Sequence, residues 1–166
     1  MLKMRPLNAQ TLEKHMPELM DKEVVDVLND LIETAKDGEY GFAKCAERVK
    51  SGSIKETLQR RSADCRLAAQ ELRAVVAQYG GEPEDSGSVL GAMHRGWVSV
   101  KDALSVHSDH AVLEEAERGE DHALARYRKA LKAELPDHVR ALVQRQLAGA
   151  QANHDQVKVL RDSTRT

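Results

Sequence analysis

Hydrophobic residues recur every three or four positions along most of the chain, which is the period of one face of an α-helix. The first stretch with this pattern runs from about Asp21 to Lys50, and the second from about Ile54 to Tyr79. A third runs from about His110 to Glu134, and a fourth begins at Pro136-Asp137. The predicted core-facing positions of the first two are Val24, Leu28, Leu31, Ala35, Phe42, Ala46, Val49, and Ile54, Leu58, Cys65, Ala68, Leu72, Val75 and Tyr79. Those of the last two are Leu113, Ala116, Leu124, Tyr127, Leu131, and Val139, Val143, Leu147, Ala150, Val157 and Leu160.

Residues that break or cap helices separate these stretches. Ser51-Gly52-Ser53 ends the first helix and caps the second, and Gly80-Gly81-Glu82-Pro83 ends the second. Pro17 is expected to interrupt any long helix near the N-terminus. We therefore expect an N-terminal arm over residues 1–20, a helical bundle over 21–162 and a frayed tail over 163–166.

The lengths of the connections predict the topology. Two are short, which implies antiparallel neighbours, whereas the stretch from Gly80 to Asp109 is long and holds a further short helix from Ser88 to Leu104. The predicted fold class is all-α, a ferritin-like four-helix bundle of up-down-down-up topology. Its two antiparallel hairpins are joined by a long crossover that contains the extra helix.

Composition narrows the function classes. Lys plus Arg number 25 and Asp plus Glu 27, so the net charge is −2, which argues against a nucleic-acid-binding module. Aromatic residues make up only 3% of the chain, which disfavours a β-sandwich or barrel. No apolar run is long enough for a membrane span, and the N-terminus lacks the apolar segment of a signal peptide. We therefore expect a cytoplasmic protein.

Three polar residues lie on the apolar stripes of three different helices: Glu39, Glu120 and His154. A buried carboxylate is costly unless it is paired, protonated or bound to a metal. Di-iron bundles use one Glu from each of two helices and a Glu-x-x-His from each of the other two. The fourth helix here supplies Gln151-x-x-His154, and Glu117 lies one turn before Glu120.

The second helix contains no Glu-x-x-His, and a short internal repeat that relates the two hairpins does not restore one. Arg61 and Ser62 stand where one apolar residue is missing, and Arg61 is a candidate cation for pairing with the two Glu residues. Two interpretations remain: a structural polar layer that fixes helix register, or a mononuclear or dinuclear metal site. An Arg61 that filled the central space would exclude the dinuclear site.

Several motifs together make the chain resemble a known family. They are Asp37-Gly38-Glu39, Gly80-Gly81-Glu82-Pro83, Ser88 through Trp97 with its His-Arg-Gly-Trp, Glu117-Arg118-Gly119-Glu120-Asp121, Tyr127 and His154-Asp155. From about Glu23 to Asp162 the chain resembles an uncharacterised bacterial family of ferritin-like four-helix-bundle proteins, classed as a domain of unknown function. The resemblance implies a ferritin-like bundle and no established activity.

The wider ferritin-like group, such as rubrerythrins and bacterioferritins, is similar in topology. That similarity implies ligand roles for Glu39, Glu120 and His154, with Gln151 in place of a ligand Glu. The leading hypothesis is a non-enzymatic binding or association protein with a degenerate di-iron site, and without a confident cofactor. It would self-associate or bind a protein partner through the face around Trp97. The alternative is an iron- or manganese-binding carboxylate protein or oxidoreductase, with Glu39, Glu117, Glu120, Gln151 and His154 as candidate ligands.

Overall fold

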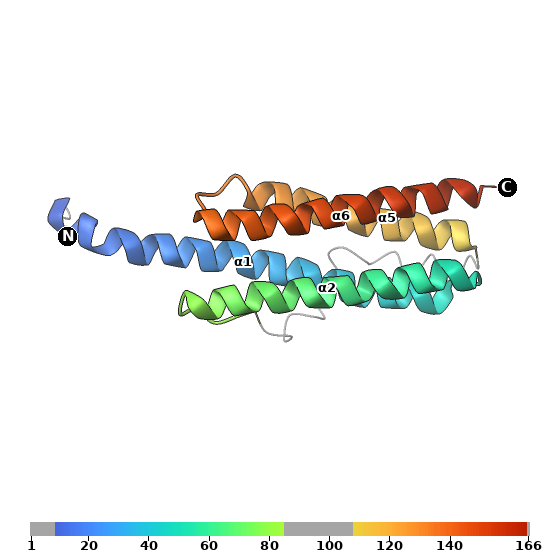
Figure 1. Cartoon of the computed structure of the whole chain (residues 1–166), viewed down its shortest axis with the longest axis horizontal. Coiled ribbons are helices and arrows are strands. Elements are labelled where there is room, and N and C mark those ends of the chain that lie inside the picture. Colours follow the sequence, from blue (N-terminus) through green and yellow to red (C-terminus); the bar gives the residue numbers. More distant parts are fainter. Residues whose placement is uncertain (1–8, 85–107, 166) are drawn as a thin grey trace, which may run out of the picture.

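A computed structural model describes residues 9–84 and 108–165, and its regular secondary structure in these ranges is entirely helical. The four helices are α1 (Ala9–Arg48), α2 (Gly52–Gln78), α5 (Asp109–Ala130) and α6 (Asp137–Ser163) (Figure 1). They pack against one another, which confirms the prediction of a four-helix arrangement. The helix predicted from Ser88 to Leu104 lies outside the described residues.

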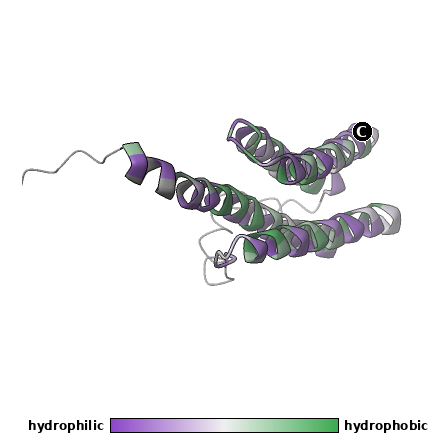
Figure 2. Cartoon of the chain, turned by 60° about the vertical axis from the view of Figure 1, so that its left-hand side comes forward, coloured by the Kyte–Doolittle hydropathy of each residue, from purple (hydrophilic) through white to green (hydrophobic). Residues whose placement is uncertain are grey.

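The helices form two antiparallel hairpins, α1 with α2 and α5 with α6 (Figure 1). The hairpins lie as two layers, and hydrophobic and hydrophilic residues alternate along each helix (Figure 2). Between the layers α1 packs along α5, whereas α2 and α6 are the least intimately packed pair of neighbours. α1 and α6 run in one direction and α2 and α5 in the other. None of the helices in the described ranges is long and apolar enough to cross a membrane.

Hydrogen bonds fix which ends of the two hairpins meet. The Asp109 carboxylate, at the start of α5, accepts hydrogen bonds from the backbone N–H groups of Lys50 (2.7 Å) and Ser51 (3.0 Å) in the α1–α2 turn. At the other end, Tyr79 after α2 stacks on His138 in the first turn of α6. The chain therefore leaves α2 at one end of the bundle and enters α5 at the other.

The apolar core consists of two clusters, one toward each end of the bundle. One surrounds the α1–α2 turn, and the other lies near the α5–α6 loop. The first contains Phe42, Cys45, Ala46, Val49, Ile54, Leu58, Cys65, Val112, Leu113, Ala116 and Val157, and the second contains Val24, Leu28, Leu31, Ile32, Leu72, Val76, Tyr127, Ala130, Leu135, Val139 and Val143. The predicted apolar stripe of α1 is buried, and so is that of α5 except for Leu131 at its C-terminal end, which is half-buried. The two clusters leave a polar layer between them.

The predicted start of the first helix near Asp21 is wrong, because α1 begins at Ala9 and continues through Pro17. A proline removes one hydrogen bond from the helical ladder and crowds the preceding turn. This part of α1 projects beyond the other three described helices (Figure 1), so none of them constrains its path around the proline.

The register predicted for the second half of α2 is also wrong. Its buried residues are Ala69, Leu72 and Val76, whereas Ala68 and Val75 are only half-buried. The pattern allowed steps of three or four at each position, and the choice depends on how α2 meets α1 and α6. Arg61 and Ser62, which interrupt the apolar pattern, are both buried as the sequence indicated.

Gly38 marks the closest approach of α1 to α2. A Cβ atom at this position would lie 2.7 Å from the Sγ atom of Cys65, which is much shorter than a normal contact. The Cys65 thiol is buried, and burial raises its pKa to about 12, so it packs as a neutral apolar group. The missing side chain at Gly38 therefore brings Cys65 of α2 directly against the backbone of α1.

We expect Gly38→Ala to lower the free energy of unfolding by about 1–2 kcal/mol, because overpacking outweighs the better helix propensity of alanine. In a Cys65→Ala background the obstructing sulfur is absent, so the same substitution should stabilise the protein. Urea unfolding of the four proteins measures this change of sign. Gly149→Ala is the matched control, since a Cβ there meets nothing within 4 Å and should stabilise both backgrounds. A destabilising Gly38→Ala in the Cys65→Ala background would contradict this packing.

Candidate functional site

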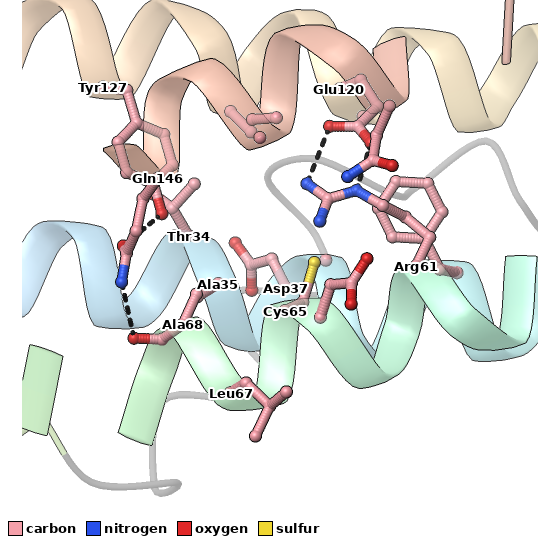
Figure 3. A pocket seen from close by; sticks show the side chains of 18 of the residues that line it. Thr34, Ala35, Asp37, Arg61, Cys65, Leu67, Ala68, Glu120, Tyr127 and Gln146 are labelled. Atoms are coloured by element: carbon pink, nitrogen blue, oxygen red, sulfur yellow. Dashed lines mark hydrogen bonds and ion pairs between the residues drawn. The ribbon is translucent and has the colours of Figure 1, made fainter. Parts of the chain in front are cut away.

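The polar layer between the two apolar clusters is built around a buried ion pair. Arg61 of α2 donates hydrogen bonds to both carboxylate oxygens of Glu120 on α5, from Nε to Oε1 at 2.5 Å and from Nη2 to Oε2 at 3.1 Å. Glu120 is 0% exposed and Arg61 9%. Because α2 and α5 lie diagonally opposite in the bundle, this bidentate pair spans its centre (Figure 3).

Burial and pairing act in opposite directions on these two groups. Burial raises the pKa of the Glu120 carboxyl, and the hydrogen bonds from Arg61 offset part of that rise. Burial also opposes the charge on Arg61, but the hydrogen bond and the charge of Glu120 outweigh it and raise the pKa of the guanidinium. The guanidinium also lies 5.3 Å from the centre of the Phe42 ring. Arg61 therefore stays charged, and Glu120 depends on it.

Glu39 does not join this pair, and its predicted place on the buried stripe of α1 is wrong. Its side chain is partly exposed and accepts a hydrogen bond from Nε of Arg66 at 2.7 Å, on the outer surface of α2. Gly38 occupies the core-facing position between Ala35 and Phe42, and it packs on Cys65. A glycine has no side chain, so the hydropathy pattern assigned the buried position to its neighbour.

His154 lies beside two carboxylates of α5, near the surface of the α5–α6 hairpin. Its Nε2 atom is 2.8 Å from Asp121 Oδ1 and 3.8 Å from Glu117 Oε1, and its Nδ1 atom is 3.2 Å from Asp155 Oδ1. Ligand atoms of Glu117, Asp121 and His154 lie within 4.8 Å of one another. Glu117 is also paired with Arg161. The structure thus brings together two of the predicted metal ligands, with Asp121 as a third member.

The other candidate ligands lie apart from this cluster. Gln151 hydrogen-bonds to Arg128 and to Asp155 (3.0 Å) on the surface of α6. Glu120 is held by Arg61 and Glu39 by Arg66. The five predicted ligands therefore do not converge on one dinuclear centre among the residues that the structure describes. Trp97, the anchor of the predicted partner surface, lies outside those residues.

A cavity of about 230 Å³ occupies the middle of the bundle beside the ion pair, lined by all four helices (Figure 3). Small residues surround much of it, including Ala35, Gly38, Ala68, Gly119 and Ala150. It reaches the surface between α2 and α6, the least closely packed neighbours, where Leu67 is 56% exposed. The ion pair of Arg145 with Glu71 links α2 and α6 beside this opening.

Two polar side chains of the cavity wall form a chain of hydrogen bonds. The Tyr127 hydroxyl donates to Oε1 of Gln146 (2.9 Å), and Nε2 of Gln146 donates to the carbonyl of Ala68 (3.3 Å) (Figure 3). Asp37 also lines the cavity and is only 6% exposed. Within the described ranges its carboxylate accepts no hydrogen bond. Burial raises its pKa to about 6, and the charge of Arg126 offsets part of the rise.

Sequence reasoning missed both Asp37 and Asp121. Asp37 is adjacent to Gly38. The sequence does not show that Gly38 faces α2, and without that contact the buried face of α1 cannot be assigned to Asp37. Asp121 is exposed, but it lies four residues after Glu117, a spacing that places two side chains on one helical face. That spacing was the available signal for a carboxylate pair facing His154.

Over the described residues, these features define an all-helical bundle of four helices with a buried ion pair and a cavity at its centre. A family model matches residues 23–133, about two thirds of the chain, and its family is described as Domain of unknown function (DUF2383). The chain belongs to this family. The matched range includes Asp37, Arg61 and Glu120, and ends before α6, which supplies Gln146 and His154. Comparison with curated proteins finds no match.

Proposed function

We propose that the protein is a non-redox, ferritin-like binding protein in which an arginine–glutamate pair stands in the place of a dinuclear metal centre. One observation carries this proposal: the Arg61 guanidinium is bound by both oxygens of Glu120 at the centre of the bundle. In di-iron bundles the inward-facing carboxylates at this level are metal ligands. Here both oxygens of the Glu120 carboxylate accept hydrogen bonds from a cation of the chain itself, Arg61.

The remaining residues of the layer do not fit a dinuclear centre. α2 buries Arg61, Ser62 and Cys65 in this layer, and no carboxylate or histidine of α2 is buried. Its Asp64 and Glu71 line the cavity without being buried. Ser62 donates its hydroxyl hydrogen to the carbonyl of Glu39 (2.7 Å), so it acts as a link between α1 and α2. The up-down-down-up arrangement supports the ferritin-like assignment. The cavity beside this polar layer supports a binding role.

Anaerobic loading with iron(II), followed by elemental analysis, tests this proposal. We expect the wild type to hold fewer than two iron ions per chain, and Glu120→Ala to leave the iron content unchanged. Two iron ions per chain that are lost in Glu120→Ala would overturn the proposal. Arg66→Ala is the control for a general effect of removing charge, since this arginine is exposed.

A second candidate function is suggested by the cluster of Glu117, Asp121 and His154. Two carboxylates and one imidazole suit a single divalent ion such as manganese(II) or iron(II). The Nδ1 atom of His154 lies by Asp155, an arrangement that orients a metal-ligating ring. The ion would displace the contacts between His154 and Asp121, and between Glu117 and Arg161. This site would be separate from the central ion pair.

For this second candidate we expect one manganese(II) ion per chain, bound in the micromolar range or weaker because Arg161 competes for Glu117. His154→Ala should weaken binding about tenfold or more. His138→Ala is the matched control, because that histidine lies on Tyr79 at the far end of the bundle. The low-temperature electron paramagnetic resonance of manganese(II) distinguishes bound from free ion. Equal binding by the wild type and His154→Ala would rule the site out.

We propose further that the protein is cytoplasmic and acts by self-association or with a protein partner, through the face that includes Trp97. The balanced charge and the helical bundle support a protein partner over a nucleic acid.

A further inference from the structure

We propose that the central cavity is a binding site for a small primary ammonium compound, whose charged group is held by Asp37 and whose apolar body fills the space among the small residues. This inference rests on the proposed function, because it names the ligand class of the binding protein proposed above. It depends on the cavity and on Asp37, neither of which belongs to the His154 cluster.

The Asp37 carboxylate determines which kind of chemical group the cavity would bind. An ionised carboxylate only accepts hydrogen bonds, and a buried one that accepts none is costly in free energy. Asp37 is buried to 6% exposure and its side chain faces the cavity (Figure 3). The two arginines that line the cavity are already paired, Arg61 with Glu120 and Arg145 with Glu71. Of the charges near Asp37, Arg126 acts on it without a hydrogen bond. A ligand here must therefore bring its own donor, and a cationic donor gives the strongest bond.

The volume of the cavity limits the size of the ligand. An engineered apolar cavity of about 150 Å³ holds benzene. By that scale the space beside Asp37, about 230 Å³, accommodates a compound of roughly eight to ten non-hydrogen atoms. An aromatic ring or a short branched chain with one aminomethyl group fits this volume. A polyamine or a nucleotide does not.

The residues that line the cavity limit the chemical class of the ligand. Ala35, Gly38, Ala68, Gly119 and Ala150 present backbone and methyl groups to the cavity, and Cys65 adds a neutral thiol. The Tyr127–Gln146–Ala68 chain of hydrogen bonds is complete within itself and offers no strong unpaired donor for an anion. The lining surface is therefore more apolar than polar, and its polar side chains include the carboxylates of Asp37, Asp64 and Glu71. This distribution selects a compact amphipathic cation over a sugar or an organic acid.

The position of the opening determines how a ligand reaches the cavity. The cavity opens between α2 and α6, where Leu67 and Gly149 are exposed. Gly149 has open space around the position of a Cβ atom. A larger side chain at this position can therefore obstruct the opening without displacing a neighbouring helix.

The test is a titration of the full chain with three probes of similar size, followed by calorimetry and by protein chemical shifts at neutral pH. The probes are benzylammonium, benzyl alcohol and benzoate. We expect saturable binding of benzylammonium, weaker binding of benzyl alcohol and no binding of benzoate. Asp37→Asn should weaken benzylammonium about tenfold or more and leave benzyl alcohol nearly unchanged.

Two further variants keep the test decisive. Gly149→Leu should obstruct the opening and abolish binding while the helical content and thermal stability are retained. Asp26→Asn, at an exposed position of the same helix, is the matched control and should bind like the wild type. No saturable binding of benzylammonium, or equal affinity in the wild type and Asp37→Asn, would overturn the inference. The iron measurement is independent of this outcome, so failure of one proposal is distinguishable from failure of the other.

Discussion

Arg61→Met is expected to lower the free energy of unfolding by about 3–5 kcal/mol, which is the typical cost of removing one partner of a buried ion pair. Glu120 is fully buried, and both of its oxygens accept hydrogen bonds from Arg61. Without the guanidinium, the carboxylate would lie uncompensated at the centre of the bundle, or would bind a proton. Urea unfolding followed by circular dichroism measures the loss.

The pH dependence of this loss has a defined sign. Burial raises the pKa of Glu120 even with Arg61 present, and it would raise that pKa further in Arg61→Met. A raised pKa in the folded state means that folding favours the protonated carboxyl, so lowering the pH stabilises the folded variant relative to the unfolded chain. The penalty of Arg61→Met should therefore be largest at alkaline pH and shrink as the pH falls toward the ordinary range of a carboxyl group.

The double variant Arg61→Met/Glu120→Met should recover most of the lost stability, because a buried ion pair can often be replaced by apolar side chains at little cost. Arg66→Met is the matched control. It removes the partner of Glu39 in an exposed pair with side-chain exposures of 61% and 32%, and such pairs contribute about 0–1 kcal/mol. If Arg61→Met costs no more than Arg66→Met, the central pair is not the structural element described here.

Asp37→Asn is expected to raise the free energy of unfolding by about 2 kcal/mol at about pH 8, and to have almost no effect at about pH 4. The pKa of Asp37 is raised from 3.8 to about 6 by burial. Below the unfolded value the carboxyl is protonated in both states and carries no penalty. As the pH rises through this window the unfolded chain ionises first, so the folded state loses stability relative to it. Above about pH 6 the full penalty is present.

Urea unfolding of the wild type and Asp37→Asn at several pH values between these limits measures the difference. Asp26→Asn, at an exposed site on the same helix, should show no comparable trend. A difference that does not change with pH would mean that Asp37 is not a buried, ionisable group in the folded protein. A stabilising substitution at a cavity residue also fits a binding site, because binding groups are often held at a cost to stability.

The two Asp37 experiments support each other. The Asp37 carboxylate, which accepts no hydrogen bond from the described residues, is also the group that would hold an ammonium ion. A ligand that binds the folded state adds stability according to its affinity and concentration. Benzylammonium should therefore stabilise the wild type at alkaline pH and have little effect on Asp37→Asn.

Much of the fold follows from local sequence. The steps of three and four that include Val24, Leu28 and Leu31 define one helical face without any knowledge of neighbours, and Ser51, Gly80 and Pro136 mark boundaries by backbone chemistry alone. Arg61 and Glu120 were also visible as polar residues on apolar stripes. Their pairing was one of several possibilities, because the sequence does not state which stripes face each other across the bundle.

The rest was decided by how the helices pack. Asp37 and Glu39 lie on either side of Gly38, about 200° apart around the axis of α1. The contact between Gly38 and Cys65 sets the rotation that buries Asp37 and leaves Glu39 partly exposed. The projecting start of α1 tolerates Pro17 because α2, α5 and α6 do not pack beside it. His154 meets Asp121 only because α5 and α6 pair in a particular register.

The sequence by itself determined four long helices, most of their boundaries and the polar character of the central layer, since these depend on spacing, caps and breakers within one segment. Tertiary structure alone decided that Arg61 and Glu120 form the pair, that Asp37 is buried without a hydrogen bond from the described helices, and that a cavity opens between α2 and α6. Each of these depends on distances between side chains far apart in the chain, which small rotations and shifts of packed helices set.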